Sequence, residues 1–95
     1  MNKLSEDEIN KKLAQLPDWE LAADKSLHRL FEFKDFKQAF AFMTAVAPTA
    51  DDLNHHPDWS NSYNTVNVHL FSHEASGLSE LDFELAAKMN ALYQI

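Results

Sequence analysis

Scarcity of glycine is the feature that most restricts how this chain can turn. One glycine, Gly77, and three prolines occur in 95 residues. Because glycine adopts left-handed and other special backbone conformations most readily, the tight connections here must rely on Asn, Asp, Ser and Pro. Clusters of these residues therefore mark the breaks between elements. No linker or internal repeat interrupts the pattern, and the length predicts one domain over residues 1–95.

Three capping signatures predict the starts of three helices. In each, a Ser or Asp is followed three residues later by a side chain that can bond back to it. Apolar residues then recur at helical spacing. The central helix contains Pro48, which either lies near its end or kinks it before a further turn over residues 49–53. The signatures are Ser5 with Glu8, Asp35 with Gln38, and Ser79 with Asp82.

The segments between the helices have the character of strands. Residues 19–23 and 27–33 flank a turn at Asp24-Lys25 and predict a hairpin. Residues 63–72 alternate apolar and polar side chains, which predicts a half-buried antiparallel strand, and a short extended piece over 58–61 can precede it. The order helix, hairpin, helix, strands, helix predicts a two-layer α+β fold. The helices would cover one sheet face, and the other would face solvent or a dimer partner.

Charge and composition exclude several classes of function. Eight Lys and Arg against fifteen Asp and Glu give a net charge of −7, which argues against nucleic acid or an anionic membrane as partner. The chain has no cysteine, so disulfides, Cys-zinc sites and thiol nucleophiles are excluded. The start of the sequence lacks the apolar stretch of a signal peptide, and no apolar run approaches the ~20 residues of a membrane helix. We therefore expect a cytoplasmic protein.

Three histidines near loop signals, His55, His56 and His73, are the candidate acid/base groups. Asp51 lies four residues before His55, and Asp82 lies nine residues after His73. Imidazole exchanges protons near neutral pH, and a nearby carboxylate can hold it in place. We expect Asp51 to orient His55. Asp82 is expected to hold His73, to cap its own helix, or both.

Less specific interpretations compete with this one. An adjacent His pair before Pro57 is often a surface loop, and the strand residues His28 and His69 are expected to be structural. A zinc site is disfavoured by the His spacing, and no Gly-x-Ser-x-Gly motif is present to support a serine hydrolase. We therefore do not expect a metal site.

Taken together, these residues resemble the signature of the pterin-4a-carbinolamine dehydratases, also called 4a-hydroxytetrahydrobiopterin dehydratases. The resemblance extends over the whole chain. It implies a four-stranded antiparallel sheet with about three helices on one face, and assembly as a homodimer or homotetramer. It also implies a hydro-lyase that converts 4a-hydroxytetrahydropterin to quinonoid dihydropterin and so recycles the cofactor of aromatic amino-acid hydroxylases. The matching segments are Asp51-x3-His55-His56-Pro57-Asp58-Trp59, Tyr63-Asn64-Thr65-Val66, Ser72-His73-Glu74 and Gly77-Leu78-Ser79-Glu80-Leu81-Asp82.

The resemblance also assigns roles to single residues. It implies that His55, His56 and His73 are catalytic and that Asp51 and Asp82 are supporting carboxylates. It also implies that no metal or organic cofactor is required. Our hypothesis makes His55 and His73 the main acid/base pair, with His56 assisting at the hydroxyl and in pterin binding. The family often has Glu where this chain has Asp51, whose shorter side chain can displace the hydrogen bond.

Two alternative functions remain open at this point. Animal members of the family also act as dimerisation partners of a homeodomain transcription factor, so a non-catalytic interaction module is one alternative. The apolar surface around Phe36, Phe40 and Met43 could serve such a role or self-association. The other alternative is activity on a molybdopterin-like pterin.

Overall fold

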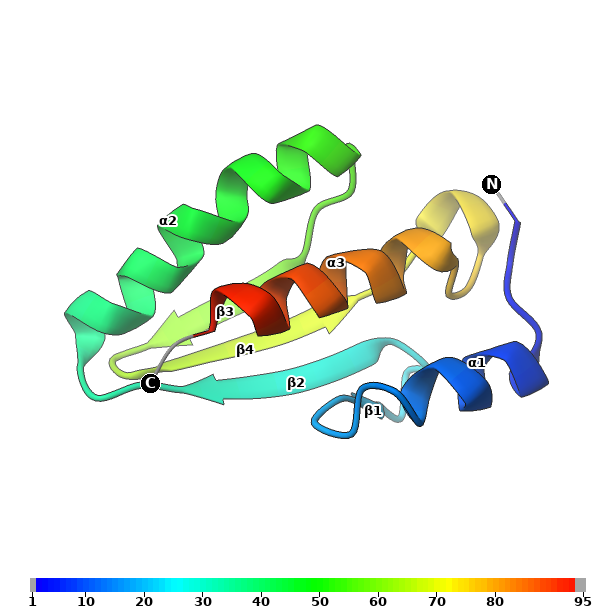
Figure 1. Cartoon of the computed structure of the whole chain (residues 1–95), viewed down its shortest axis with the longest axis horizontal. Helices are drawn as coiled ribbons and strands as arrows, with labels where there is room; N and C mark the ends of the chain where they lie inside the picture. The colour runs from blue at the N-terminus through cyan, green and yellow to red at the C-terminus, as the bar shows by residue number, and fades with distance from the viewer. Residues whose placement is uncertain (1, 94–95) are drawn as a thin grey trace.

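A computed structural model describes residues 2–93 and shows two layers, a sheet and the helices that cover one of its faces (Figure 1). The α+β fold predicted from the sequence is confirmed, including four strands and three α-helices. The elements in chain order are α1 (Glu6–Leu13), β1 (Glu20–Leu21), β2 (Leu27–Glu32), α2 (Phe36–Leu53), β3 (Asp58–Ser62), β4 (Thr65–Leu70), a 3₁₀ turn (His73–Ala75) and α3 (Glu80–Leu92).

The sheet has the strand order β1-β2-β4-β3, and every neighbouring pair is antiparallel. The central pair, β2 and β4, is aligned from Leu27 opposite Leu70 to Glu32 opposite Thr65. Side chains alternate across these strands, so one face of the sheet enters the core and the other stays open. Figure 1 shows α2 and α3 lying along the covered face, with α1 beside the β1 end.

Phe31 lies at the centre of the core. Its side chain has no exposed surface, and its ring lies 4.7 Å from that of Phe42, 5.0 Å from Tyr93 and 5.8 Å from Trp19, measured between ring centroids. The Trp19 and Tyr93 rings meet it edge-on, a geometry that aromatic pairs favour. One aromatic side chain of β2 therefore joins α2, the end of α3 and the segment before β1.

The three capping signatures are where the sequence placed them. Ser5 and Ser79 both form complete capping boxes, and Asp35 accepts a hydrogen bond from the backbone N–H of Gln38 at 2.9 Å. Helix α2 continues through Pro48 to Leu53, as the kinked-helix alternative allowed.

Two strand predictions need correction. The strand expected over residues 63–72 begins only at Thr65, because Tyr63 has a φ of 45° and belongs to the turn that joins β3 to β4. The extended stretch expected over 19–23 pairs only at Glu20–Leu21. In both cases the predicted strand was too long, because the apolar–polar alternation and the aromatic residues continue into the connecting segments.

The left-handed positions of the chain are occupied by residues other than glycine. Lys25, Asn54, Tyr63 and Ser76 all have positive φ, whereas Gly77 does not. Each such residue carries a Cβ that crowds the backbone in this conformation. Asn54 and Ser76 are of the residue types expected in tight connections, whereas Lys25 and Tyr63 are not. The turn predicted at Asp24-Lys25 is present between β1 and β2.

Replacing Phe31 by Ala should lower the free energy of unfolding by about 3–5 kcal/mol, because it empties the centre of the core. The matched control is Phe40→Ala on α2, whose side chain is 54% exposed and should change stability by less than about 0.5 kcal/mol. Urea unfolding followed by circular dichroism measures both. Equal effects of the two substitutions would contradict this description of the core.

Candidate active site

A left-handed residue at the end of α2 sets the directions of the two adjacent histidines. Asn54 has φ 49° and ψ 43°, and its N–H and that of His55 bond to the carbonyls of Asp51 and Ala50, each at 3.0 Å. This pattern ends the helix and reverses the chain. His55 is consequently buried, whereas His56 is exposed.

His55 is paired with Asp82, a carboxylate with no exposed surface. Nε2 of His55 lies 2.5 Å from Oδ1 of Asp82. The other carboxylate oxygen, Oδ2, accepts hydrogen bonds from the Ser72 hydroxyl at 2.7 Å and from the Ser79 N–H at 2.9 Å. Three donors therefore satisfy the buried carboxylate. Because Nε2 faces Asp82, Nδ1 is the ring nitrogen of His55 that is free of the carboxylate.

His56 is paired with Asp51 at the surface. The distance from Nε2 of His56 to Oδ1 of Asp51 is 2.9 Å, and the two side chains are 58% and 79% exposed. Water screens a pair this exposed, so it orients His56 without adding much stability.

Both expected pairings of carboxylate and imidazole are therefore wrong. Asp51 orients His56 and not His55, because the left-handed turn at Asn54 ends the helical spacing that would have aligned residues 51 and 55. Asp82 holds His55 and not His73. The expected capping role of Asp82 is confirmed, because it accepts the N–H of Ser79 at the start of α3.

Two adjoining surface hollows contain the histidines. The edge hollow has a volume of about 200 Å³, and the sheet-face hollow has about 260 Å³. His56, Phe71 and His73 line both, so the two form one continuous candidate site. His55, Asn54, Ser72 and Glu74 complete the edge hollow, and Asp24, Ser26, Asp58 and His69 complete the sheet-face hollow.

His73 contributes from the 3₁₀ turn that follows β4. Its ring meets that of Phe71 edge-on, with 5.1 Å between centroids, and its side chain is exposed. The turn is anchored by backbone bonds between Ser72 and Gly77. His73 thus faces the shared part of the two hollows from a fixed position.

A larger depression of about 460 Å³ lies near the N-terminus. It contains no histidine, and its charged and polar lining residues are Asn2, Lys3, Glu8, Ser79 and Glu80. It offers no group that exchanges protons near neutral pH, so the histidine hollows are the better candidate despite their smaller size.

The sequence interpretation missed part of the site. His69 was expected to be structural, and Asp24, Ser26 and Asp58 were not considered for it, yet all four line the sheet-face hollow. The available signal was the alternation of β4, since residues 69 and 71 are on the sheet face opposite the buried Val66, Val68 and Leu70. Asp24 and Ser26 reach the hollow from the β1–β2 turn, which no local pattern reveals.

Within residues 2–93 no group of three His, Cys, Asp or Glu side chains is arranged to hold a metal ion. The helices among these same residues are too short or too polar to cross a membrane.

The sequence profile of the family described as "Pterin 4 alpha carbinolamine dehydratase" matches residues 2–92. This chain belongs to the pterin-4a-carbinolamine dehydratase family. A protein of Mesorhizobium japonicum, provisionally named pterin-4-alpha-carbinolamine dehydratase, is 55% identical over 89 residues, which cover 93% of this chain and 91% of that protein. A provisionally named dehydratase of Solibacter usitatus is 47% identical over 90 residues, 95% of this chain and 94% of its own.

Solved structures agree with this family membership. The crystal structure of a transcriptional coactivator/pterin dehydratase from Brucella melitensis superposes with a TM-score of 0.94 at 44% identity, covering 98% of this chain and 100% of that chain. A pterin dehydratase-like protein described as a RuBisCO assembly factor in the alpha-carboxysome gives a TM-score of 0.67 at 26% identity, covering 79% of this chain and 88% of that one. Proteins with this dehydratase fold thus carry more than one described role.

The two histidine–carboxylate pairs should differ in their effect on stability. His55→Ala leaves the buried Asp82 without its imidazole partner and should cost about 3–5 kcal/mol. His56→Ala breaks only the exposed pair and should cost at most about 1 kcal/mol. Thermal unfolding of both variants at pH 7 measures the difference. A His56→Ala protein that is as unstable as His55→Ala would refute the observed pairing.

Proposed function

We propose that this chain catalyses the dehydration of 4a-hydroxytetrahydropterin to quinonoid dihydropterin by histidine acid/base catalysis. The observation that carries the proposal is the convergence of His55, His56 and His73 on one pair of adjoining hollows. Family membership over residues 2–92 supports the same pterin chemistry.

The reaction requires two proton transfers and little else. The bond between C4a and the hydroxyl oxygen breaks, a proton delivered to that oxygen lets it leave as water, and the proton on N5 is removed as the double bond between N5 and C4a forms. A positioned imidazole can perform each transfer, typically with a rate gain of 10²–10⁴-fold.

The three histidines differ in a way that suits these tasks. Buried His55 has Nε2 fixed by Asp82, so its Nδ1 is held in one orientation. Exposed His56 and His73 line both hollows, so both can reach a ligand there. We assign His55 and His73 to the two proton transfers, and His56, oriented by Asp51, to the hydroxyl.

The wider biological setting is part of the proposal. The reaction would recycle the cofactor of an aromatic amino-acid hydroxylase in the cytoplasm, with the protein acting as a homodimer or homotetramer. A molybdopterin-like substrate is the alternative within the same chemistry. An adjacent aromatic hydroxylase gene would support recycling, and adjacent molybdenum-cofactor genes would support the alternative.

An interaction role is the second candidate function. Phe36 and Phe40 are 49% and 54% exposed on α2, with ring centroids 5.7 Å apart, and they form an apolar patch suited to a protein partner. The coactivator and assembly-factor names of the two solved structures fit such a role. A pure interaction module would be indifferent to the loss of His73.

His73→Ala should lower the rate of dehydration about 10²-fold or more while leaving the fold intact, because His73 is exposed. Stopped-flow absorbance of 4a-hydroxytetrahydropterin, generated in situ by an aromatic hydroxylase, measures the decay with and without protein. Wild-type protein that does not accelerate the decay would refute the reaction. Acceleration that persists in folded His73→Ala would refute the assignment of His73.

Asp51→Asn should lower the same rate only several-fold, because the exposed Asp51 orients His56 and does not contact His55. Asp52→Asn is the matched control, since it removes an equal charge from the neighbouring exposed position and should leave the rate unchanged. A loss of 10²-fold in Asp51→Asn, or equal losses in both variants, would contradict the role assigned to Asp51.

A further inference from the structure

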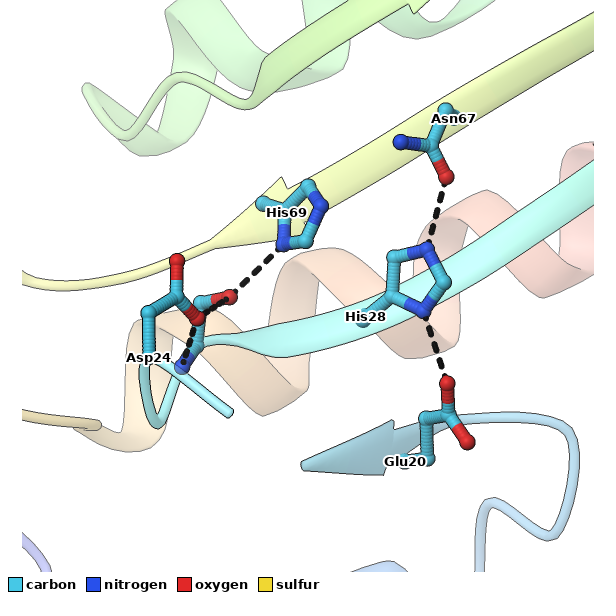
Figure 2. A network of polar contacts seen from close by, with 6 residues as sticks. Glu20, Asp24, His28, Asn67 and His69 are labelled. Carbon is cyan, nitrogen blue, oxygen red and sulfur yellow. Dashed lines mark hydrogen bonds and ion pairs between the residues drawn. The ribbon is translucent and has the colours of Figure 1, made fainter. Parts of the chain in front are cut away.

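A line of hydrogen bonds on the open face of the sheet ends at His69. The Ser26 hydroxyl donates to Oδ1 of Asp24 at 2.6 Å, and Nδ1 of His69 lies 2.7 Å from the same hydroxyl oxygen. Figure 2 shows Asp24, in the β1–β2 turn, joined in this way to His69 on β4. The acid/base roles assigned above do not involve any of these three residues.

The direction of these bonds fixes the tautomer of His69. Both the N–H and the hydroxyl of Ser26 bond to Oδ1 of Asp24, and these bonds lower the pKa of Asp24, so this carboxyl stays ionised at neutral pH and can only accept. With its proton given to Asp24, the Ser26 oxygen accepts from His69. Nδ1 of His69 must therefore carry a proton.

A second histidine, His28, lies against His69. Nδ1 of His28 lies 2.9 Å from Oε2 of Glu20, and its Nε2 lies 2.6 Å from Oδ1 of Asn67 (Figure 2). These two contacts hold the His28 ring in place. The His28 and His69 rings lie 4.6 Å apart and are tilted by 33°.

Several polar side chains surround His69. The His28 ring on β2 packs against it, Asp24 is joined to it through Ser26, and Asp58 lies opposite it in the β3–β4 register. His56 and His73 line the same hollow.

In the neutral imidazole that carries its proton on Nδ1, Nε2 is a hydrogen-bond acceptor. The ring is half-buried and lines the sheet-face hollow, and Nε2 has no hydrogen-bond partner among residues 2–93. A purely structural histidine in a core would have both nitrogens satisfied. This one has its Nδ1 fixed from one side and its other nitrogen left for a ligand.

We propose that His69 is a substrate-binding residue whose Nε2 accepts a hydrogen bond from an N–H group of the pterin ring system, with Ser26 and Asp24 as positioning residues that fix its tautomer. This inference rests on the proposed function, because a pterin is the ligand. The fit is chemical: a reduced pterin presents N–H donors on its pyrimidine ring, its amino group and its reduced ring. A fixed acceptor in the hollow favours a ligand that presents such N–H donors.

The first test measures the tautomer directly. Long-range ¹H–¹⁵N spectra of the wild-type protein should show His69 with its proton on Nδ1 at pH 7. Ser26→Ala should shift His69 toward a mixture of tautomers and raise the pKa of Asp24 part of the way toward its ordinary value, since it removes the Ser26 hydroxyl bond, the main cause of the lowered pKa. The Asp24 bond to the Ser26 backbone N–H survives this change and keeps the turn. If His69 keeps the same tautomer in Ser26→Ala, the positioning role assigned to Ser26 and Asp24 is wrong.

The second test measures binding without turnover. Titration with 7,8-dihydrobiopterin, followed by quenching of tryptophan fluorescence, should give a Kd about tenfold higher for His69→Ala, consistent with the loss of one hydrogen bond. Ser26→Ala should raise the Kd about threefold. Ser60→Ala, an exposed position on the same sheet face outside the hollow, is the matched control and should leave the Kd unchanged.

The outcomes separate this inference from the proposed reaction. Wild-type protein that binds the probe, loses affinity in His69→Ala and yet fails to accelerate dehydration would refute the reaction and support the role of His69. Unchanged affinity in His69→Ala, an equal loss in Ser60→Ala, or no binding of the probe by the wild type would each overturn the inference.

Discussion

The buried carboxylate of Asp82 is the interaction on which the arrangement of the site depends. It receives the imidazole of His55 from the end of α2, the hydroxyl of Ser72 from the end of β4, and the N–H of Ser79 from the start of α3. A buried carboxylate is stable only when donors surround it. Three elements distant in the sequence are therefore held at one point, and His55 is fixed there as a consequence. The Asp82 side chain thus both completes the capping box of α3 and orients His55, a candidate catalytic group.

Strand β4 performs two tasks with alternate residues. Val66, Val68 and Leu70 have no exposed surface and pack into the core. His69 and Phe71, whose side chains are on the opposite face of the sheet, line the sheet-face hollow. The pairing of β4 with β2 and β3 therefore fixes the core and the candidate site together, and His28 and Asp58 come beside His69 through the same registers.

Local patterns in the sequence predicted most of the fold. The capping signatures at Ser5, Asp35 and Ser79 gave all three helix starts, because a cap is a contact between residues three apart. The strand limits were less accurate at Tyr63, where a non-glycine residue takes a left-handed conformation that its side chain does not reveal. The scarcity of glycine had pointed to such turns without locating this one.

The site was predicted in its membership more than in its pairings. His55, His56 and His73 do converge, but spacing along a helix could not show that Asn54 would send His55 toward Asp82 and leave His56 with Asp51. The roles of Asp24 and Ser26 arise from a contact across the sheet to His69, 43 positions from Ser26, so no local pattern contains it. Long-range contacts of this kind appear only once the strand order is known.

The division of β4 between core and hollow has a consequence for how this family can diversify. Substitution at residue 69 or 71 alters the hollow while the packed residues keep their places. Inserting or deleting a single residue between Tyr63 and His73 would exchange the two sets, since one step along a strand reverses its faces. Related proteins should therefore differ in the side chains that line the hollow before they differ in the length of this stretch, and a change in that length would mark a relative with a different function.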